Sequence, residues 1–130
     1  MAQSMKAELF AGRGCGSLSI SATSQGDSVV VHASGEVDLC SVPLLDWSLR
    51  EASTLSTAPA PIVVDLSEVG FLNSSGINVL LKHVVHCREL GTPLRVVAAS
   101  RAVRRPIELL GLGIMLPVFA TVRAAVRRAA

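Results

Sequence analysis

The chain has 130 residues, of which half are hydrophobic and 17% are charged, and its formal net charge is +2. This length suits one domain with its own core, and the core must be aliphatic because Tyr is absent and only 3% of the residues are aromatic. No apolar run approaches the ~20 residues that cross a bilayer, and the first residues lack the pattern of a secretory signal. We therefore expect a soluble cytoplasmic protein.

Charge is distributed unevenly along the chain. Residues 1–100 carry six basic and nine acidic side chains, whereas residues 101–130 carry six arginines against Glu108 alone. A basic end can contact nucleic acid. Arginines at helical spacing are more typical of solvated helix faces, however, and no aromatic residues are interleaved with them for base stacking. We predict no direct binding to nucleic acid.

The three cysteines, Cys15, Cys40 and Cys87, are an odd number with no closely spaced pair. This pattern indicates neither a disulfide framework nor a zinc ribbon. In the reducing cytoplasm such cysteines are expected to be free thiols. A regulatory disulfide stays open as an alternative.

The first elements follow a Gly- and Ser-rich start. Residues 1–16 have few apolar side chains, so we predict a flexible segment there and a single domain over residues 17–130. Residues 17–23 and 28–35 read as strands joined by the turn "SQGD", which predicts a hairpin. Residues 42–55 predict a helix with Ser41 as N-cap and Pro43 in its first turn. Its apolar face is expected to include Leu44, Trp47 and Leu55.

Strands and helices then alternate to the end of the chain. Residues 62–66 form an apolar run typical of a strand that is covered on both faces. A helix from the "NSSG" stretch to about Leu90 ends at Gly91. Further strands are predicted at 94–100 and 114–119, with helices at 101–112 and 121–130. The order β-β-α-β-α-β-α-β-α predicts an α/β fold with an open, mainly parallel sheet.

Two polar clusters follow strands of this sheet, "GEVD" at 35–38 and "NSSG" at 73–76. If the two strands are neighbours, Asp38 and Ser75 lie near each other at the carboxyl edge of the sheet, where functional groups gather. A serine at a helix N-terminus can carry a phosphoryl group, since free N–H groups and the helix dipole favour negative charge there. The added charge would then reject a partner that had docked on the bare serine.

Catalysis and metal binding fit the same residues less well. The stretch "LNSSG" lacks the first glycine of a G-x-S-x-G elbow, and His83 and His86 fall inside the helix that follows Ser75. His83 and Cys87 are spaced as a pair on one helix face, but two ligands make no metal site. We expect these two to be surface side chains and predict no enzyme, cofactor or metal.

The helix after "NSSG" has an apolar stripe that should face the sheet, namely Ile77, Leu80, Leu81, Val84 and Val85. The opposite face carries Val79, Lys82, His83 and His86, with Asn78 at its edge. An exposed Val79 beside two serines is a mild indication of a docking surface.

These stretches resemble a known family. "GEVD", followed by "IVVDLSEVGFLNSSGINVLL" and "LRVVAASRAVRRPIELLGL", is similar to the anti-sigma factor antagonists, the STAS domain of bacteria, over about residues 17–125. The resemblance implies a sheet of four to five strands with helices on one side. It also implies binding to an anti-sigma factor that is an ATP-dependent serine kinase. Binding frees the sigma factor, phosphorylation ends the binding, and a serine phosphatase resets the cycle.

The resemblance also assigns residues. The family's phosphorylated serine directly precedes the glycine and is here Ser75, Asp38 matches the family's nearby acidic residue, and Asn73 replaces a usual Asp. Ser74 is expected to be local structure that caps the helix together with Asn73. The expected partner-binding residues are Asp38, Ser41, Asn73, Ser74, Gly76, Asn78, Val79, Lys82 and His83. The alternative is a STAS scaffold, or a small-ligand or redox sensor, without a phosphorylation cycle.

Overall fold

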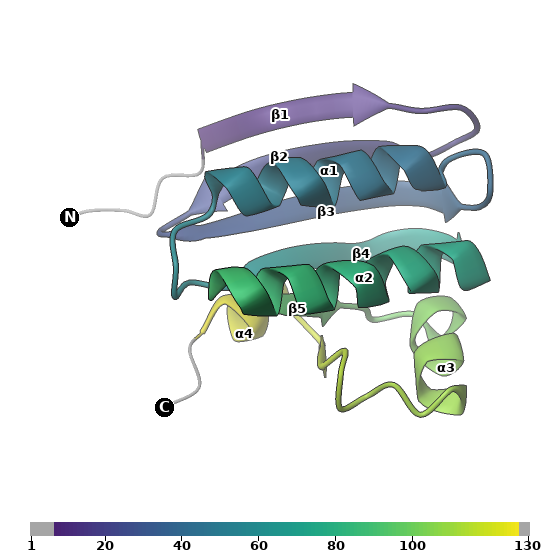
Figure 1. Cartoon of the computed structure of the whole chain (residues 1–130). Coiled ribbons are helices and arrows are strands. Elements are labelled where there is room, and N and C mark those ends of the chain that lie inside the picture. Colours follow the sequence, from purple (N-terminus) through teal and green to yellow (C-terminus); the bar gives the residue numbers. More distant parts are fainter. Residues whose placement is uncertain (1–6, 128–130) are drawn as a thin grey trace.

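A computed structural model describes residues 7–127 as one six-stranded sheet with four helices (Figure 1). The strands lie side by side in chain order. The first three pair antiparallel and the remaining pairs are parallel. The strands are β1 (Ala7–Arg13), β2 (Ser19–Gln25), β3 (Ser28–Val37), β4 (Ile62–Leu72), β5 (Leu94–Val97) and β6 (Val118–Phe119).

Three helices connect the parallel strands and cover one face of the sheet. They are α1 (Val42–Leu55), α2 (Ser74–Leu90) and α3 (Arg101–Leu109). Because side chains alternate along a strand, Val29 and Val31 enter the core beneath these helices while Val30 points to the other face. There Val30 packs with Ala125 of α4 (Val122–Val126). None of the helices within residues 7–127 is long and apolar enough to cross a membrane.

The predicted α/β class with a mainly parallel sheet is confirmed. The sheet has six strands rather than four to five, and α4 lies on the face opposite the other helices. The extra strand is β1, which occupies residues that were expected to belong to a flexible segment; residues 1–6 lie outside the described part. β1 pairs antiparallel with β2 at the edge of the sheet. An edge strand gains its hydrogen bonds from one neighbour, so it forms with few buried side chains, and Phe10 meets Trp47 of α1 edge to face at 5.2 Å.

The apolar face predicted for α1 is wrong in its orientation. Leu45, Leu49 and Ala52 point into the core, whereas Trp47 is 42% exposed and Leu55 is 46% exposed. The small residues Ser48 and Ser53 complete the buried face. Trp47 lies off this face because Phe10 of β1, a strand that the sequence did not predict, packs against it.

The boundaries predicted for α2 are confirmed, but its buried face is rotated toward α1. Gly91 ends the helix in the left-handed conformation with φ 79°, and its N–H bonds back to the last turn. Val85 is 47% exposed and Leu81 is only half-buried, while His83 and Cys87 are buried instead. The expectation that His83 and Cys87 are surface residues is therefore wrong. Because α1 packs beside α2, the inner surface of α2 is shared between the sheet and a second helix (Figure 1).

Candidate functional site

The two predicted polar clusters meet at one edge of the sheet. β3 and β4 are parallel neighbours whose last paired residues are Val37 and Leu72. The Asn73 N–H donates to the Val37 carbonyl oxygen at 3.1 Å, which ties the start of α2 to the end of β3. The loop before α1 and the first turn of α2 therefore lie next to each other at this edge (Figure 1). We call this region, residues 38–41 and 73–79, the switch edge.

The loop before α1 is held by reciprocal bonds between Asp38 and Ser41. The Ser41 N–H donates to Asp38 Oδ1 at 3.0 Å, and Ser41 Oγ accepts from the Asp38 N–H at the same distance. The buried Ser41 hydroxyl lies 2.9 Å from the Glu36 carbonyl oxygen and can donate to it. Ser41 thus occupies the predicted N-cap position, but its hydroxyl fixes the preceding loop instead of capping α1.

The start of α2 is capped by Asn73, as predicted. Asn73 Oδ1 accepts from the Gly76 N–H at 3.0 Å and from the Ser75 hydroxyl at 3.1 Å. Ser75 is half-buried and Ser74 is exposed. The serine that joins Asn73 in the cap is therefore Ser75, and the expectation that Ser74 does so is wrong. The cap also fixes the direction of the Ser75 hydroxyl.

Gly76 is required by packing at this edge. A Cβ atom at this position would lie 2.6 Å from Leu72 Cδ1 and 2.8 Å from Val37 Cγ1, closer than carbon atoms can approach. Both neighbours are themselves buried in the core. The glycine of "SSG" therefore lets the first turn of α2 approach the ends of β3 and β4.

Replacing Gly76 by Ala should lower the free energy of unfolding by about 1–3 kcal/mol, the usual cost of overpacking a well-packed site. The control is Gly70→Ala, since a Cβ atom at Gly70 has no heavy atom within 4 Å. Urea unfolding of both variants measures the difference. Equal stability of the two variants would contradict a packing role for Gly76.

The structure divides the predicted partner-binding residues by exposure. Ser41, Gly76 and His83 are buried in the chain alone, so they do not belong to the surface that is open to a partner. The side chains that reach the surface fully or in part are those of Asp38, Asn73, Ser74, Ser75, Asn78, Val79 and Lys82. Sequence analysis missed Leu39, which is 75% exposed on the switch edge, and Phe71, which is 48% exposed near the end of β4. Both could have been suspected from the sequence, because Leu39 directly follows "GEVD" and Phe71 lies two residues before "NSSG".

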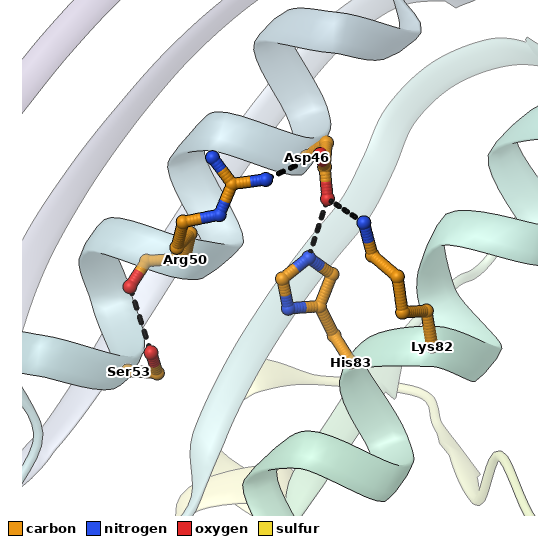
Figure 2. A network of polar contacts seen from close by, with 5 residues as sticks. All are labelled: Asp46, Arg50, Ser53, Lys82 and His83. Carbon is orange, nitrogen blue, oxygen red and sulfur yellow. Dashed lines mark hydrogen bonds and ion pairs between the residues drawn. The ribbon is translucent and has the colours of Figure 1, made fainter.

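Asp46 of α1, also missed, is the centre of a network that joins α1 to α2. Its Oδ1 accepts from His83 Nε2 at 2.7 Å and from Lys82 Nζ at 2.8 Å, and its Oδ2 accepts from Arg50 at 2.8 Å (Figure 2). Burial lowers the pKa of His83 below its ordinary value, although the Asp46 carboxylate opposes this. Burial acts to raise the pKa of Asp46, but the bonds from Lys82 and His83 and the Arg50 charge hold that pKa below its ordinary value. At neutral pH His83 is thus a neutral donor to an ionised Asp46.

The cysteines depart from the prediction of free thiols. Cys15 and Cys40 form a disulfide with a Cα–Cα distance of 5.8 Å, which links the β1–β2 connection to the switch edge. Cys87 is free and buried, and burial raises its thiol pKa, so it is a poor nucleophile. Within residues 7–127, no three His, Cys, Asp or Glu side chains gather as metal ligands.

The sheet face opposite α1 and α2 carries a separate polar cluster. The His32 ring lies between Thr23 Oγ1 and Asp65 Oδ2, at 3.3 Å from each. Burial tends to raise the pKa of Asp65, but bonds from His32 and Ser67 hold it below its ordinary value. His32 and Asp65 border a hollow of about 590 Å³. We call this region, around His32 and Asp65, the outer face.

Comparisons with known proteins point to one family. Residues 19–125 match the STAS domain. The anti-sigma-F factor antagonist RsfA of Mycobacterium tuberculosis is 35% identical over 98 residues, which are 75% of this chain and 77% of RsfA. The anti-sigma-F factor antagonist RsfB of the same organism is 30% identical over 111 residues, which are 84% of this chain and 87% of RsfB.

The chain is also similar in structure to solved anti-sigma factor antagonists. The crystal structure of an anti-sigma factor antagonist from Mycobacterium paratuberculosis has a TM-score of 0.74 and 32% identity, covering 86% of this chain and 96% of that one. The anti-sigma factor antagonist SpoIIAA in its unphosphorylated form has a TM-score of 0.67 at 20% identity, covering 82% of this chain and 92% of SpoIIAA, and shares the fold.

Proposed function

The chain belongs to the STAS domain family and is similar to anti-sigma factor antagonists, so we propose that it binds an anti-sigma factor and thereby releases a sigma factor. The observation that carries the proposal is the switch edge. It combines an oriented Ser75 hydroxyl with the exposed Leu39 and the half-buried Val79, a polar and apolar mixture that suits a protein partner. The exchange belongs in the cytoplasm, where sigma factors act.

We propose further that the anti-sigma factor is a serine kinase and that it ends the binding by phosphorylating Ser75. The γ-phosphoryl group of ATP would pass to Ser75 Oγ, with ADP leaving and the hydroxyl proton released. Support comes from the position of Ser75 in the first turn of α2, because helix N-terminal N–H groups and the dipole stabilise a phosphate. SpoIIAA, which shares the fold, has itself been solved in a phosphorylated form. A serine phosphatase would restore the hydroxyl.

Asn73 fits this cycle despite replacing an Asp. Its carbonyl oxygen accepts from the Ser75 hydroxyl in the unmodified protein. A phosphoserine has no hydroxyl proton to donate, and its oxygens are strong acceptors. By turning its amide, Asn73 can then present its NH₂ donors to the phosphate, which a carboxylate could not do.

The direct test is incubation with the cognate anti-sigma kinase and ATP, followed by mass-spectrometric mapping. Wild type and Ser74→Ala should gain one phosphoryl group on Ser75, and Ser75→Ala should gain none. Ser74→Ala is the matched control because it removes the neighbouring exposed hydroxyl. A phosphoryl group mapped to another residue, or full labelling of Ser75→Ala, would overturn the assignment.

The disulfide favours redox control as a second candidate. It ties the loop with Asp38 and Ser41 to the β1–β2 connection, so its reduction should change the freedom of that part of the switch edge. We expect reduction to change the affinity for the partner by about fivefold or more, roughly 1 kcal/mol. Cys15→Ser should show one affinity under both conditions. If wild type binds equally when reduced and oxidised, with thiol counts verified, redox control is ruled out.

A further inference from the structure

A hollow of about 260 Å³ lies between α1 and α2 and is lined by Arg50, Lys82, His83 and His86. It is separate from the switch edge: Lys82 lies seven residues beyond Ser75 along α2, about 10 Å at the rise of an α-helix.

The charges around the hollow are unbalanced. Arg50 and Lys82 are both cations, and within residues 7–127 Asp46 is the one carboxylate that pairs with them. Asp46 also accepts the bond from His83, so its two oxygens serve three donors. The Arg50 and Lys82 side chains are each 57% exposed and can reorient toward a ligand. The hollow therefore keeps an excess of positive charge at its mouth.

His83 borders the hollow and carries a hydrogen-bonding atom that has no partner among the described residues. Its side chain is only 3% exposed, and Nδ1 is buried with no hydrogen-bond partner among the residues that the structure describes. Figure 2 shows this nitrogen on the side of the ring that faces away from Asp46. An unpaired buried polar atom is costly because it has lost its water without gaining a partner, so such atoms are rare and need an explanation. A ligand that reaches His83 Nδ1 from the hollow would give this nitrogen a hydrogen-bond partner.

We propose that this hollow binds a small oxyanion, such as a sulfate, phosphate or carboxylate group. Arg50 of α1 and Lys82 of α2 supply positive charge, and the Nδ1–H group of a protonated His83 donates a hydrogen bond to the anion. Charge-assisted bonds of this kind are the strong ones in protein sites. His86 borders the same hollow, with its ring 6.3 Å from that of His83.

Binding must be coupled to a proton. In the neutral His83 that donates Nε2–H to Asp46, Nδ1 carries a lone pair, which repels an anion. The anion therefore requires the imidazolium, and the site takes up one proton with it. The charged or titratable groups around the ring are Asp46 and Arg50 from α1 and Lys82 and His86 from α2. Since the free protein holds the pKa of His83 below its ordinary value, affinity should rise as the pH falls through neutrality.

Sulfate is the appropriate probe because it stays a dianion across this range. Nuclear magnetic resonance of the full chain, titrated with sulfate at constant ionic strength, should shift the His83 ring signals saturably. The dissociation constant should fall by up to about tenfold per pH unit, the limit for uptake of one proton. Arg50→Met and Lys82→Met should each raise it about tenfold, or roughly 1.4 kcal/mol. Arg88→Met, which removes an exposed cation of α2 away from the hollow, should leave it unchanged.

The rim variants carry the test because the exposed Arg50 and Lys82 side chains can be replaced without removing a buried group, and thermal melts verify their folding. A dissociation constant that is independent of pH overturns the proposal. So does equal binding by the Arg50→Met, Lys82→Met double variant. A sulfate response confined to residues outside the hollow has the same consequence.

Discussion

Replacing Ser75 by Glu should weaken binding to the anti-sigma factor by at least about 100-fold, or roughly 2.7 kcal/mol. The substitution places a carboxylate where the Ser75 hydroxyl now donates to Asn73 Oδ1. At the centre of an interface, an unpaired charge must lose its water without gaining a partner. Isothermal titration calorimetry of the purified partner with wild type and variant measures the effect.

The control for this prediction is Thr54→Glu. Thr54 is exposed in the last turn of α1, away from the switch edge, and the change in charge is the same. Its affinity should match that of wild type within about twofold, since a remote surface charge changes binding little. Equal loss of affinity in both variants would indicate a general charge effect and contradict docking at Ser75.

Replacing Asp46 by Ala should destabilise the packing of α1 against α2. In Asp46→Ala the buried His83 Nε2–H loses its acceptor at 2.7 Å. A buried donor left unpaired costs about 1–3 kcal/mol, and the lost pairs with Arg50 and Lys82 add up to about 1 kcal/mol each. We expect a loss of roughly 2–4 kcal/mol in the free energy of unfolding, measured by urea titration at neutral pH.

Glu51→Ala is the matched control, because it removes one carboxylate from the same helix with no salt bridge found to its side chain in the described residues. It should cost less than about 0.5 kcal/mol, as is usual for surface substitutions. If Asp46→Ala and Glu51→Ala are equally stable, the network does not hold α1 against α2.

The network also predicts how stability depends on pH. The pKa of His83 is lower in the folded protein than its ordinary value of 6.5, so the unfolded chain binds a proton that the folded chain does not. Stability from this group is therefore complete above that value and falls as the pH drops below it. The lowered pKa of Asp46 acts in the same direction only at much more acidic pH, below its ordinary value of 3.8.

The sequence predicted those helices and strands that have a clear local signal, either a run of apolar residues or residues typical of a helix end. Residues 62–66 of β4 and all of β5 are buried or half-buried, and α2 has a clear N-cap at Asn73 and a clear stop at Gly91. β1 was missed because an edge strand needs few buried side chains, and its pairing with β2 cannot be read from local composition. The orientation of α1 was wrong for the same reason, since Phe10 of β1 provides the contact for Trp47.

The candidate site shows the same division. The adjacency of "GEVD" and "NSSG" followed from strand order, and Asn73 was correctly identified as a cap. The buried pair of His83 and Asp46 depends on how α1 and α2 lie side by side, which helical periodicity alone does not encode. The Cys15–Cys40 link joins residues 25 positions apart, through a pairing with β1 that the sequence did not reveal.

Docking of an anti-sigma factor on the switch edge can be tested residue by residue. The measurement is hydrogen exchange of the full chain, alone and with the purified partner. Docking predicts slower exchange over residues 38–41 and 73–79 in the complex than in the chain alone. This protection should disappear after phosphorylation. Exchange on the outer face around His32 and Asp65 should not change. Protection confined to the outer face, with unchanged exchange at residues 73–79, would contradict it.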